Sequence, residues 1–433
     1  MKWTGGFYFQ AHWINNLHLK TVLIYIGGLS SCERGAVGTH TRGILHAFLK
    51  SRRFSTCHLI GSSLDCFTDS ELAKHDLSYL GIPQGTLLNK WQFYNRYIHA
   101  ILSQVKDILR EHTGSHILIY HRYSPAISPG LFKKMKGIDI KSIQLVLEYN
   151  DLTIEQLKFA AQNKAWSPLN AWLRVNPVSL SILHLKERNC FRLADIVVCV
   201  TEKLCDYVNQ ISGKNHAIRV ENATDKNLIL KYQSSDRTEV RNRLHMLSNT
   251  FYMVHAGTLT YWDGLAELLS ALSRTKNRNK IKLLIIGEGA MKSSLMNITR
   301  NLKLEGNVEF MDAMPFEQVL EYVFAADLIP LLKTITSYQL SPIKYYESLG
   351  LGKYILATDV PYIQEAAQIE LGATVSLPLD VERVAVVLDQ LYENHGKLMA
   401  LSDAIQTYAL TNHTWTKRVE TILDSLDDLP ILL

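Results

Sequence analysis

Apolar runs of strand length alternate with helical stretches along almost the whole chain. The first half contains TVLIYIGG, HILIYHRYS and IQLVLEYND, and the second half contains FYMVHAGTL, KLLIIGEG and KYILATD. Most of these runs are continuous rather than alternating, which is typical of strands that are covered on both faces. Their alternation with helices predicts α/β architecture with parallel sheets.

The chain is too long for one ordinary core, since 433 residues predict two domains. The polar, irregular stretch after Val220 predicts a crossover between them. We therefore expect an N-terminal Rossmann-like domain at 1–221 and a C-terminal one at 222–408. The segment 409–433 contains a helix that we expect to pack back on the first domain. Ligands of open parallel sheets bind at the carboxyl ends of the strands, so the two sheets should face a central cleft.

Charge is divided unevenly between the two halves. Residues 1–220 hold 26 Lys and Arg against 15 Asp and Glu, whereas the remainder holds 20 against 26. A basic first half indicates an anionic partner, such as a membrane surface or a phosphorylated substrate, although a chance imbalance is the alternative. The segments 90–110 and 158–174 mix basic and aromatic residues, which is typical of membrane-interface helices or of helices with an aromatic core face.

Two further features concern the compartment. The six cysteines form no CxxC pair and no zinc-binding spacing, which predicts reduced thiols in a reducing compartment. The N-terminus lacks the apolar run of a signal peptide, and no stretch has the roughly 18 apolar residues of a membrane span. We predict a cytoplasmic protein, peripheral on the inner face of the plasma membrane, with no nucleic-acid partner.

The segment SPIKYYESLGLG predicts an anion site at a helix start. Ser341 is a favourable N-cap, Pro342 fits the first helical position, and the free N–H groups of the first turn attract phosphate. Lys344 adds a positive charge, and Glu347 lies one turn further on the same face. Phosphates at the helix start and a ribose at the glutamate fit a nucleoside diphosphate. The alternative is an ordinary capped helix with an exposed Lys–Glu pair.

The first half offers candidates at the ends of its strands. Gly38, in RGAVGTH, allows close approach of the main chain to a phosphate or an acceptor. His121 and Arg122 end the run HILIYHRYS, where side chains point into a cleft, and Arg122 suits an anionic acceptor or leaving phosphate. Glu148 ends IQLVLEYND and is a candidate acceptor contact. For His121, Arg122 and Glu148 a solvated or core role is the alternative.

The second half resembles the donor half of the family-four glycosyltransferases. The motifs that carry the resemblance are MVHAGTLTYWDGLAELLSAL, LLIIGEGAMKSSL, SPIKYYESLGLG and NHTWTKRVETIL, and the first half resembles the family more weakly in GGLSSCERGAVGTHTRGILHAFL. The resemblance implies a GT-B fold, a UDP- or GDP-sugar donor held mainly by the second domain, and transfer with retention of configuration.

The resemblance also implies roles for single residues. Glu347 matches the later glutamate of the family's Glu-x7-Glu signature, and Lys344 matches a lysine near the diphosphate. The donor-binding positions that it implies are Gly257, Thr258, Gly287, Glu288, Gln339, Leu340 and Ser341. Two departures stand out. Gln339 replaces the earlier glutamate, and Thr258 and Asp263 stand near the places where many relatives carry Arg and Lys.

These observations predict a retaining transferase that adds a sugar to a saccharide or lipid-linked acceptor in capsule or lipopolysaccharide synthesis. Lys344, Glu347 and Arg122 are the predicted catalytic residues. The chain has no Asp-x-Asp pair, so we predict no metal and no cofactor. Two alternatives stay open. One is a catalytically silent GT-B scaffold, and the other is an inverting transferase or an epimerase with His40 or His121 at the cleft as its base.

Overall fold

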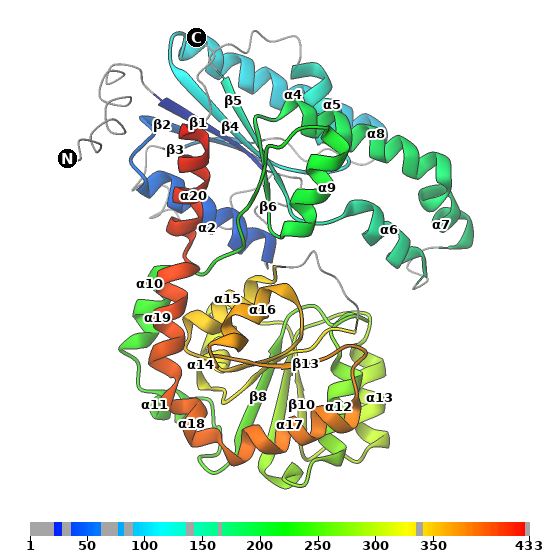
Figure 1. Cartoon of the computed structure of the whole chain (residues 1–433), viewed down its shortest axis with the longest axis vertical. Helices are drawn as coiled ribbons and strands as arrows, with labels where there is room; N and C mark the ends of the chain where they lie inside the picture. Colours follow the sequence, from blue (N-terminus) through cyan, green and yellow to red (C-terminus); the bar gives the residue numbers. More distant parts are fainter. Residues whose placement is uncertain are drawn as a thin grey trace, which may run out of the picture. The chain divides into compact units, whose positions relative to one another are not determined.

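The chain forms two α/β units in the computed structural model, which describes residues 21–27, 36–61, 77–81, 90–135, 143–162, 167–334 and 341–428. The first unit contains Met1–Cys199, Cys205–Ile218 and Ile422–Leu433, and the second contains Val200–Leu204 and Arg219–Thr421 (Figure 1).

The first unit is built on a seven-stranded sheet with the order β3-β2-β1-β4-β5-β6-β7. Its strands are β1 (Thr21–Ile26), β2 (Thr56–Gly61), β3 (Leu77–Gly81), β4 (His116–Arg122), β5 (Ile143–Tyr149), β6 (Ile196–Cys199) and β7 (Ala217–Arg219). Strand β1 pairs in parallel with both β2 and β4, and Ile26 lies beside His121. The strand order reverses between β1 and β4, and such a switch point is where open α/β sheets bind ligands.

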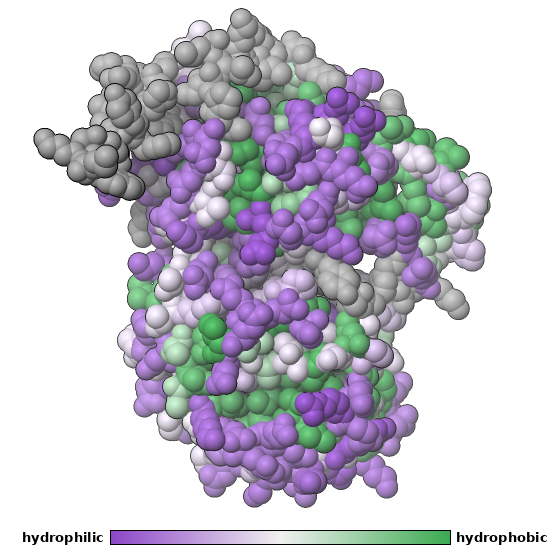
Figure 2. Space-filling model, in the orientation of Figure 1, coloured by the Kyte–Doolittle hydropathy of each residue, from purple (hydrophilic) through white to green (hydrophobic). Residues whose placement is uncertain are grey.

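The helices of the first unit are α2 (Ala36–Lys50), α4 (Lys90–Glu111), α5 (Ser128–Met135), α6 (Thr153–Gln162), α7 (Pro168–Val175), α8 (Pro177–Leu193) and α9 (Glu202–Ser212). Every residue of β1 after Thr21 is buried, as the continuous apolar run predicts for a strand that is covered on both faces. Figure 2 shows apolar side chains at the surface over α7 and α8.

The sheet of the second unit consists of two three-stranded ladders, β10-β9-β8 and β11-β12-β13. Its strands are β8 (Phe251–Ala256), β9 (Ile281–Ile286), β10 (Val308–Met311), β11 (Ile329–Leu331), β12 (Ile355–Thr358) and β13 (Ala373–Val375). A parallel bridge between Met253 and Leu328 joins the ladders. The resulting order is that of a Rossmann sheet, with its switch point between β8 and β11.

Helices cover the second sheet on both faces. They are α10 (Lys226–Gln233), α11 (Arg237–Arg243), α12 (Leu265–Arg274), the 3-10 helix η1 (Arg278–Lys280), α13 (Lys292–Asn301), α14 (Phe316–Ala325), α15 (Ile343–Gly350), α16 (Pro361–Gln368), α17 (Val381–Glu393), α18 (His395–Ala400) and α19 (Ser402–Asn412). Alternate residues of β8 belong to two separate apolar cores, Tyr252 and Val254 to one, Phe251 and Met253 to the other. This division follows from the two-residue side-chain period of a strand.

The last helix, α20 (Trp415–Asp427), begins in the second unit and ends in the first. At its start, the guanidinium of Arg418 donates hydrogen bonds to the carbonyl oxygens of Val220 and Glu221. At its end, Nη1 of Arg53 lies 2.7 Å from Oδ2 of Asp427 within the first unit. The helix is therefore held at both ends by arginine contacts.

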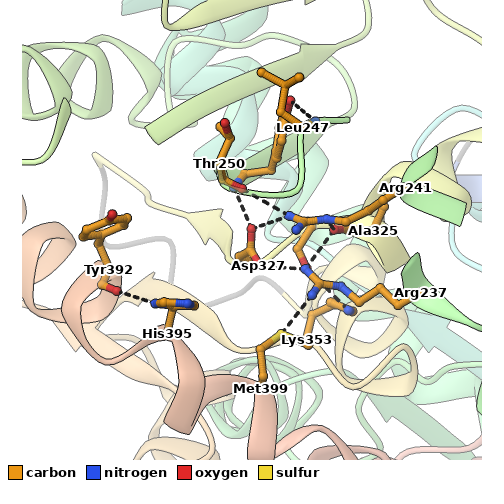
Figure 3. A network of polar contacts seen from close by, with 12 residues as sticks. Arg237, Arg241, Leu247, Thr250, Ala325, Asp327, Lys353, Tyr392, His395 and Met399 are labelled. Carbon is orange, nitrogen blue, oxygen red and sulfur yellow. Dashed lines mark hydrogen bonds and ion pairs between the residues drawn. The ribbon is translucent and has the colours of Figure 1, made fainter. Parts of the chain in front are cut away.

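A buried carboxylate joins three elements at the amino ends of the second sheet (Figure 3). Asp327 accepts hydrogen bonds from Nη2 of Arg237 at 2.7 Å, from Nη2 of Arg241 at 2.6 Å, and from the main-chain N–H of Tyr252 at 2.7 Å. Both arginines also donate to the carbonyl oxygen of Ala325 at the end of α14. The network fixes α11 and α14 to the starts of β8 and β11.

Candidate functional site

The start of α15 lies next to a buried polar cluster. Its N-cap residue is Pro342, and no hydrogen bond from the described side chains caps the helix. Ser341 is not the predicted cap, because its hydroxyl is used elsewhere. It accepts from the N–H of Asn222 at 2.9 Å and pairs with the hydroxyl of Tyr346 at 2.7 Å. The N–H of Tyr345 donates to the carbonyl oxygen of Pro342 at 2.9 Å, which leaves the first-turn N–H groups of Ile343 and Lys344 to a ligand or to solvent.

Lys344 rests against the main chain at the end of β8. A Cβ atom added to Gly257 would lie only 3.2 Å from Nζ of Lys344, and Gly257 has a φ of 137°, which side-chain-bearing residues rarely adopt. The turn after β9 packs on the same loop, because a Cβ at Gly287 would come 2.1 Å from the carbonyl oxygen of Gly257. The structure therefore brings Gly257, Gly287 and Lys344 together at the switch point.

Lys333 is a second cation at this place, and the sequence analysis missed it. It follows β11, and its Nζ lies 2.6 Å from Oδ1 of Asp263 in a pair whose side chains are only 8% and 4% exposed. The other carboxylate oxygen of Asp263 accepts from the N–H of Thr260 at 3.1 Å. Asp263 stands near the position where many relatives carry a cation. Here its carboxylate binds Lys333, a cation that comes from the segment after β11. The signal in the sequence is a charged residue directly after the apolar run LIPLL.

The charged side chains of this cluster shift one another's pKa values. Burial and the neighbouring charge of Lys333 lower the pKa of Lys344 to about 8, while Asp263 and Glu347 oppose the shift. Burial raises the pKa of Asp263, but the charges of Lys344 and Lys333 outweigh it and hold that pKa well below its usual range. A bound anion would restore the proton affinity of Lys344, as expected at a phosphate site.

His255 is the other residue that the sequence analysis missed. It lies near the end of β8, 2% exposed. Its Nδ1 is 3.4 Å from the carbonyl oxygen of Pro330, and its Nε2 has no hydrogen-bond partner among the described residues. Burial and the charge of Lys344 lower the pKa of His255 to about 3, so the ring is neutral at pH 7.

Of the remaining predicted donor residues, three are described by the structure and two are not. Glu347 is partly buried on α15, one turn beyond Lys344, and Thr258 is exposed on the loop after β8. The carboxylate of Glu288, 56% exposed, pairs with Lys292 of α13. The predictions for Gln339 and Leu340 lie outside the described residues.

Two of the predicted residues in the first unit form a buried network. Nε2 of His40 lies 2.6 Å from Oε1 of Glu148, and these side chains are 1% and 0% exposed. The carboxylate of Glu148 also accepts from the hydroxyl of Tyr120 at 2.7 Å and from Nδ2 of Asn150 at 2.8 Å. With both oxygens occupied, Glu148 has the core role that the sequence analysis kept as its alternative.

His121 is likewise a core residue, and the prediction that its side chain points into a cleft is wrong. It is fully buried. Its Nδ1 lies 3.0 Å from the carbonyl oxygen of Ile26, and its Nε2 lies 2.8 Å from Oγ of Ser128. Burial lowers the pKa of His121 to about 4. Gly38 is a buried residue in the first turn of α2.

Arg122 remains a candidate at the end of β4, the switch point of the first sheet. Its Nη1 is buried and has no hydrogen-bond partner within the described parts of the chain. Nearby, burial raises the pKa of Asp151 to about 6, and the positive charge of Arg122 opposes that shift. A buried guanidinium nitrogen without a partner is costly, which favours a missing anionic contact.

Comparison with known families then identifies the second unit. Residues 236–408 match the family model described as glycosyl transferases group 1. The second unit therefore resembles the group 1 glycosyl transferases. The match contains all the residues gathered at the switch point of the second sheet, namely Gly257, Asp263, Gly287, Lys333, Lys344 and Glu347. His40, Arg122 and Glu148 lie outside it.

Individual relatives are distant. The N-acetyl-alpha-D-glucosaminyl L-malate synthase of Bacillus anthracis is 21% identical over 276 residues, which are 64% of this chain and 64% of that protein. The chain spans 59% and 64% of the lengths of the two curated relatives that it matches first.

Solved structures show the fold. HepE of Anabaena in complex with UDP is 17% identical, with a TM-score of 0.66 over 95% of this chain and 100% of its own. WaaG, a glycosyltransferase involved in lipopolysaccharide biosynthesis, is 15% identical, with a TM-score of 0.64 over 93% of this chain and 98% of its own. The chain thus has the GT-B fold, as the sequence resemblance implied.

In the part of the chain that the structure describes, no group of three or more His, Cys, Asp or Glu side chains is arranged to hold a metal ion.

Proposed function

We propose that the chain is a retaining glycosyltransferase that moves a sugar from a UDP- or GDP-sugar to a saccharide or lipid-linked acceptor. HepE, solved with UDP, supports the donor class. WaaG, which is involved in lipopolysaccharide biosynthesis, supports the acceptor class. The pathway is then the assembly of a bacterial capsule or lipopolysaccharide, with the enzyme peripheral on the cytoplasmic face of the membrane.

The pair of lysines at the switch point carries this proposal. Cleavage of the sugar–phosphate bond leaves negative charge on a diphosphate, and preorganised cations lower the barrier most where that charge develops. Lys344, which lies against Gly257, and Lys333, held by Asp263, supply two such cations. The uncapped start of α15 supplies N–H groups and the positive end of the helix dipole. Glu347, one turn further, accepts hydrogen bonds from the ribose.

The reaction needs no protein base in this scheme. The acceptor hydroxyl attacks the anomeric carbon on the side from which the diphosphate departs. As the bond from that carbon to the phosphate oxygen breaks, the new bond to the acceptor oxygen forms, and the hydroxyl proton passes to the departing phosphate. No metal ion or other cofactor takes part. We assign Arg122 to an anionic group of the acceptor, because its buried Nη1 has no hydrogen-bond partner among the described residues.

An inverting mechanism would require a base that reaches the acceptor. The two candidate bases, His40 and His121, are 1% and 0% exposed. His40 is paired with Glu148, and both ring nitrogens of His121 have partners. This burial disfavours the inverting alternative and supports retention.

Donor binding and product analysis test the proposal. We expect calorimetric titration of the full chain with UDP, GDP, ADP and CMP to give binding of UDP or GDP, and we expect Lys344→Met to weaken it. Lys280→Met is a matched control, because Lys280 is an exposed lysine of the same unit. NMR of the product should show a retained anomeric configuration, and an inverted product would refute the mechanism. Binding without sugar transfer would favour the silent scaffold, and activity abolished by EDTA would refute the metal-free scheme.

A further inference from the structure

Two consecutive helices of the first unit expose an unusual number of large apolar side chains. Of the twelve large apolar residues that are exposed in the described ranges, six lie between 169 and 185. They are Leu169 (68% exposed), Trp172 (61%), Leu173 (50%), Val178 (68%), Ile182 (48%) and Leu185 (53%). No described residue of α7 is buried. We call these six residues the α7–α8 ridge.

The apolar residues of the ridge lie on two well-formed helices and not on a frayed helix end. On α7 its members are spaced three and four residues apart, and on α8 they are spaced four and three apart, which places each set on one helix face. Asn176 joins the two helices. Its Oδ1 accepts from the N–H of Ser179 at 3.0 Å to cap α8, and its Nδ2 donates to the carbonyl oxygen of Trp172 at 3.0 Å. Figure 2 shows the apolar surface over both helices.

The charged residues around the ridge are almost all basic. Helices α7 and α8 carry Arg174, Lys186, Arg188 and Arg192, all exposed, and Glu187 is their one acidic residue. Glu187 is fully buried, and burial raises its pKa, although hydrogen bonds from tyrosines oppose the shift. An apolar strip flanked by cations is complementary to an apolar surface that carries negative charge.

We propose that the α7–α8 ridge docks on an anionic lipid bilayer. Trp172 and the aliphatic side chains enter the headgroup region, and the four cations face lipid phosphates. Among the described helices none is long and apolar enough to cross a membrane, so the ridge lies on the surface. A second copy of the chain is a poorer occupant, because a symmetric contact would bring eight like charges together without an exposed acid from either helix pair.

This inference deepens the lipid-linked acceptor of the proposed function but can fail separately, since vesicle binding requires no sugar transfer. The test is co-sedimentation of the full chain with vesicles of phosphatidylglycerol and phosphatidylcholine, and with phosphatidylcholine alone. We expect binding to the anionic vesicles that falls steeply as salt rises, because screening shortens the reach of surface charges.

Two sets of variants separate the apolar and the electrostatic contributions. Leu169→Ser, Trp172→Ser and Leu173→Ser together should weaken binding by at least about tenfold. Lys186→Glu with Arg188→Glu should weaken it by at least about 25-fold, on the basis of about fivefold for each cation lost near the surface. Leu247→Ser with Ile369→Ser is the matched control, because these residues are 58% and 52% exposed in the second unit.

A folding check accompanies these tests, and two results would overturn the proposal. Circular dichroism and thermal unfolding check that each variant is folded, which the exposure of the ridge favours. Binding that is equal for the triple serine variant and the wild type would overturn the proposal. A lipid-independent dimer, seen by light scattering and abolished by the same variant, would also overturn it in favour of a second copy.

Discussion

Replacement of the buried carboxylate of Asp327 should be among the most destabilising single changes in the second unit. Asp327→Asn keeps the shape of the side chain but removes the charge that neutralises Arg237 and Arg241, which lie 2.7 and 2.6 Å away. Lys353 is also close. It is 3% exposed, and its pKa is well below its usual range because of burial and the charge of Arg237, which Asp327 partly offsets. The variant leaves the two guanidinium groups of Arg237 and Arg241 without the carboxylate that neutralises them.

Removal of one partner from a buried ion pair costs about 3–5 kcal/mol. In a unit of this size 1 kcal/mol shifts the unfolding midpoint by about 2–4 °C, so we expect Asp327→Asn to lower it by roughly 6–20 °C. Scanning calorimetry of the full chain measures the shift. Asp424→Asn is the control, since its pairing with Arg53 is 3.7 Å long and exposed, and a surface pair contributes about 0–1 kcal/mol.

A rescue variant distinguishes uncompensated charge from general damage. If the lost charge is the cause, Asp327→Leu combined with Arg237→Met and Arg241→Met should recover most of the midpoint, because an entire buried network can be replaced by apolar residues at little cost. A loss below about 1 kcal/mol for Asp327→Asn would refute the reasoning, since it would equal a surface pair. Failure of the rescue together with a large initial loss would show that the hydrogen bonds of the network, rather than the uncompensated charge, account for the loss.

Three further predictions concern the donor site. Lys344→Met and Lys333→Met should each lower kcat by about 10²–10³, as measured for removal of one stabilising donor in other enzymes, and wild-type turnover in either would contradict the assignment. Nucleotide affinity measured by calorimetry should fall as pH rises through about 8, because Lys344, whose pKa is lowered to about 8 by burial and Lys333, loses its proton there. The same titration should be flatter in Lys344→Met, and a pH dependence that survives the substitution would assign it to another group. Gly257→Ala should weaken UDP binding by about tenfold or more, because the residue has a φ of 137° and its new methyl group would meet Nζ of Lys344; unchanged affinity would place the nucleotide elsewhere.

The strands were the most predictable feature. The run TVLIYIGG becomes β1, Thr21–Ile26, and KYILATD contains β12, Ile355–Thr358. Both are continuous apolar runs, and each is buried from its second residue onward. Burial on two faces leaves a strong local signal, because every position of such a strand must be apolar.

Side-chain depth was the least predictable feature. The end of a strand can point a residue toward a ligand or beneath a covering helix, and local sequence does not distinguish the two. His40 of α2 meets Glu148 of β5 because the helix packs over the strand end. Ser341 likewise has the sequence of a cap, but its hydroxyl bonds Asn222, which is 119 residues away in the chain. Contacts of this kind depend on tertiary packing, which overrides local preference.

The same reasoning explains why the donor site seemed to lack its cations. A motif is read along one segment, and near Thr258 and Asp263 the segment after β8 has no positive charge. At a switch point, however, the carboxyl ends of β8 and β11 lie beside each other, although Asp263 and Lys333 are 70 residues apart. The electrostatic energy of an anionic ligand depends on its distance from each positive charge and not on which strand carries that charge. A lysine after β11 can therefore take the place of one after β8, provided that a carboxylate such as Asp263 orients it. The absence of cations near Thr258 and Asp263 is thus weak evidence for a silent enzyme, because Lys333 supplies positive charge at the same switch point.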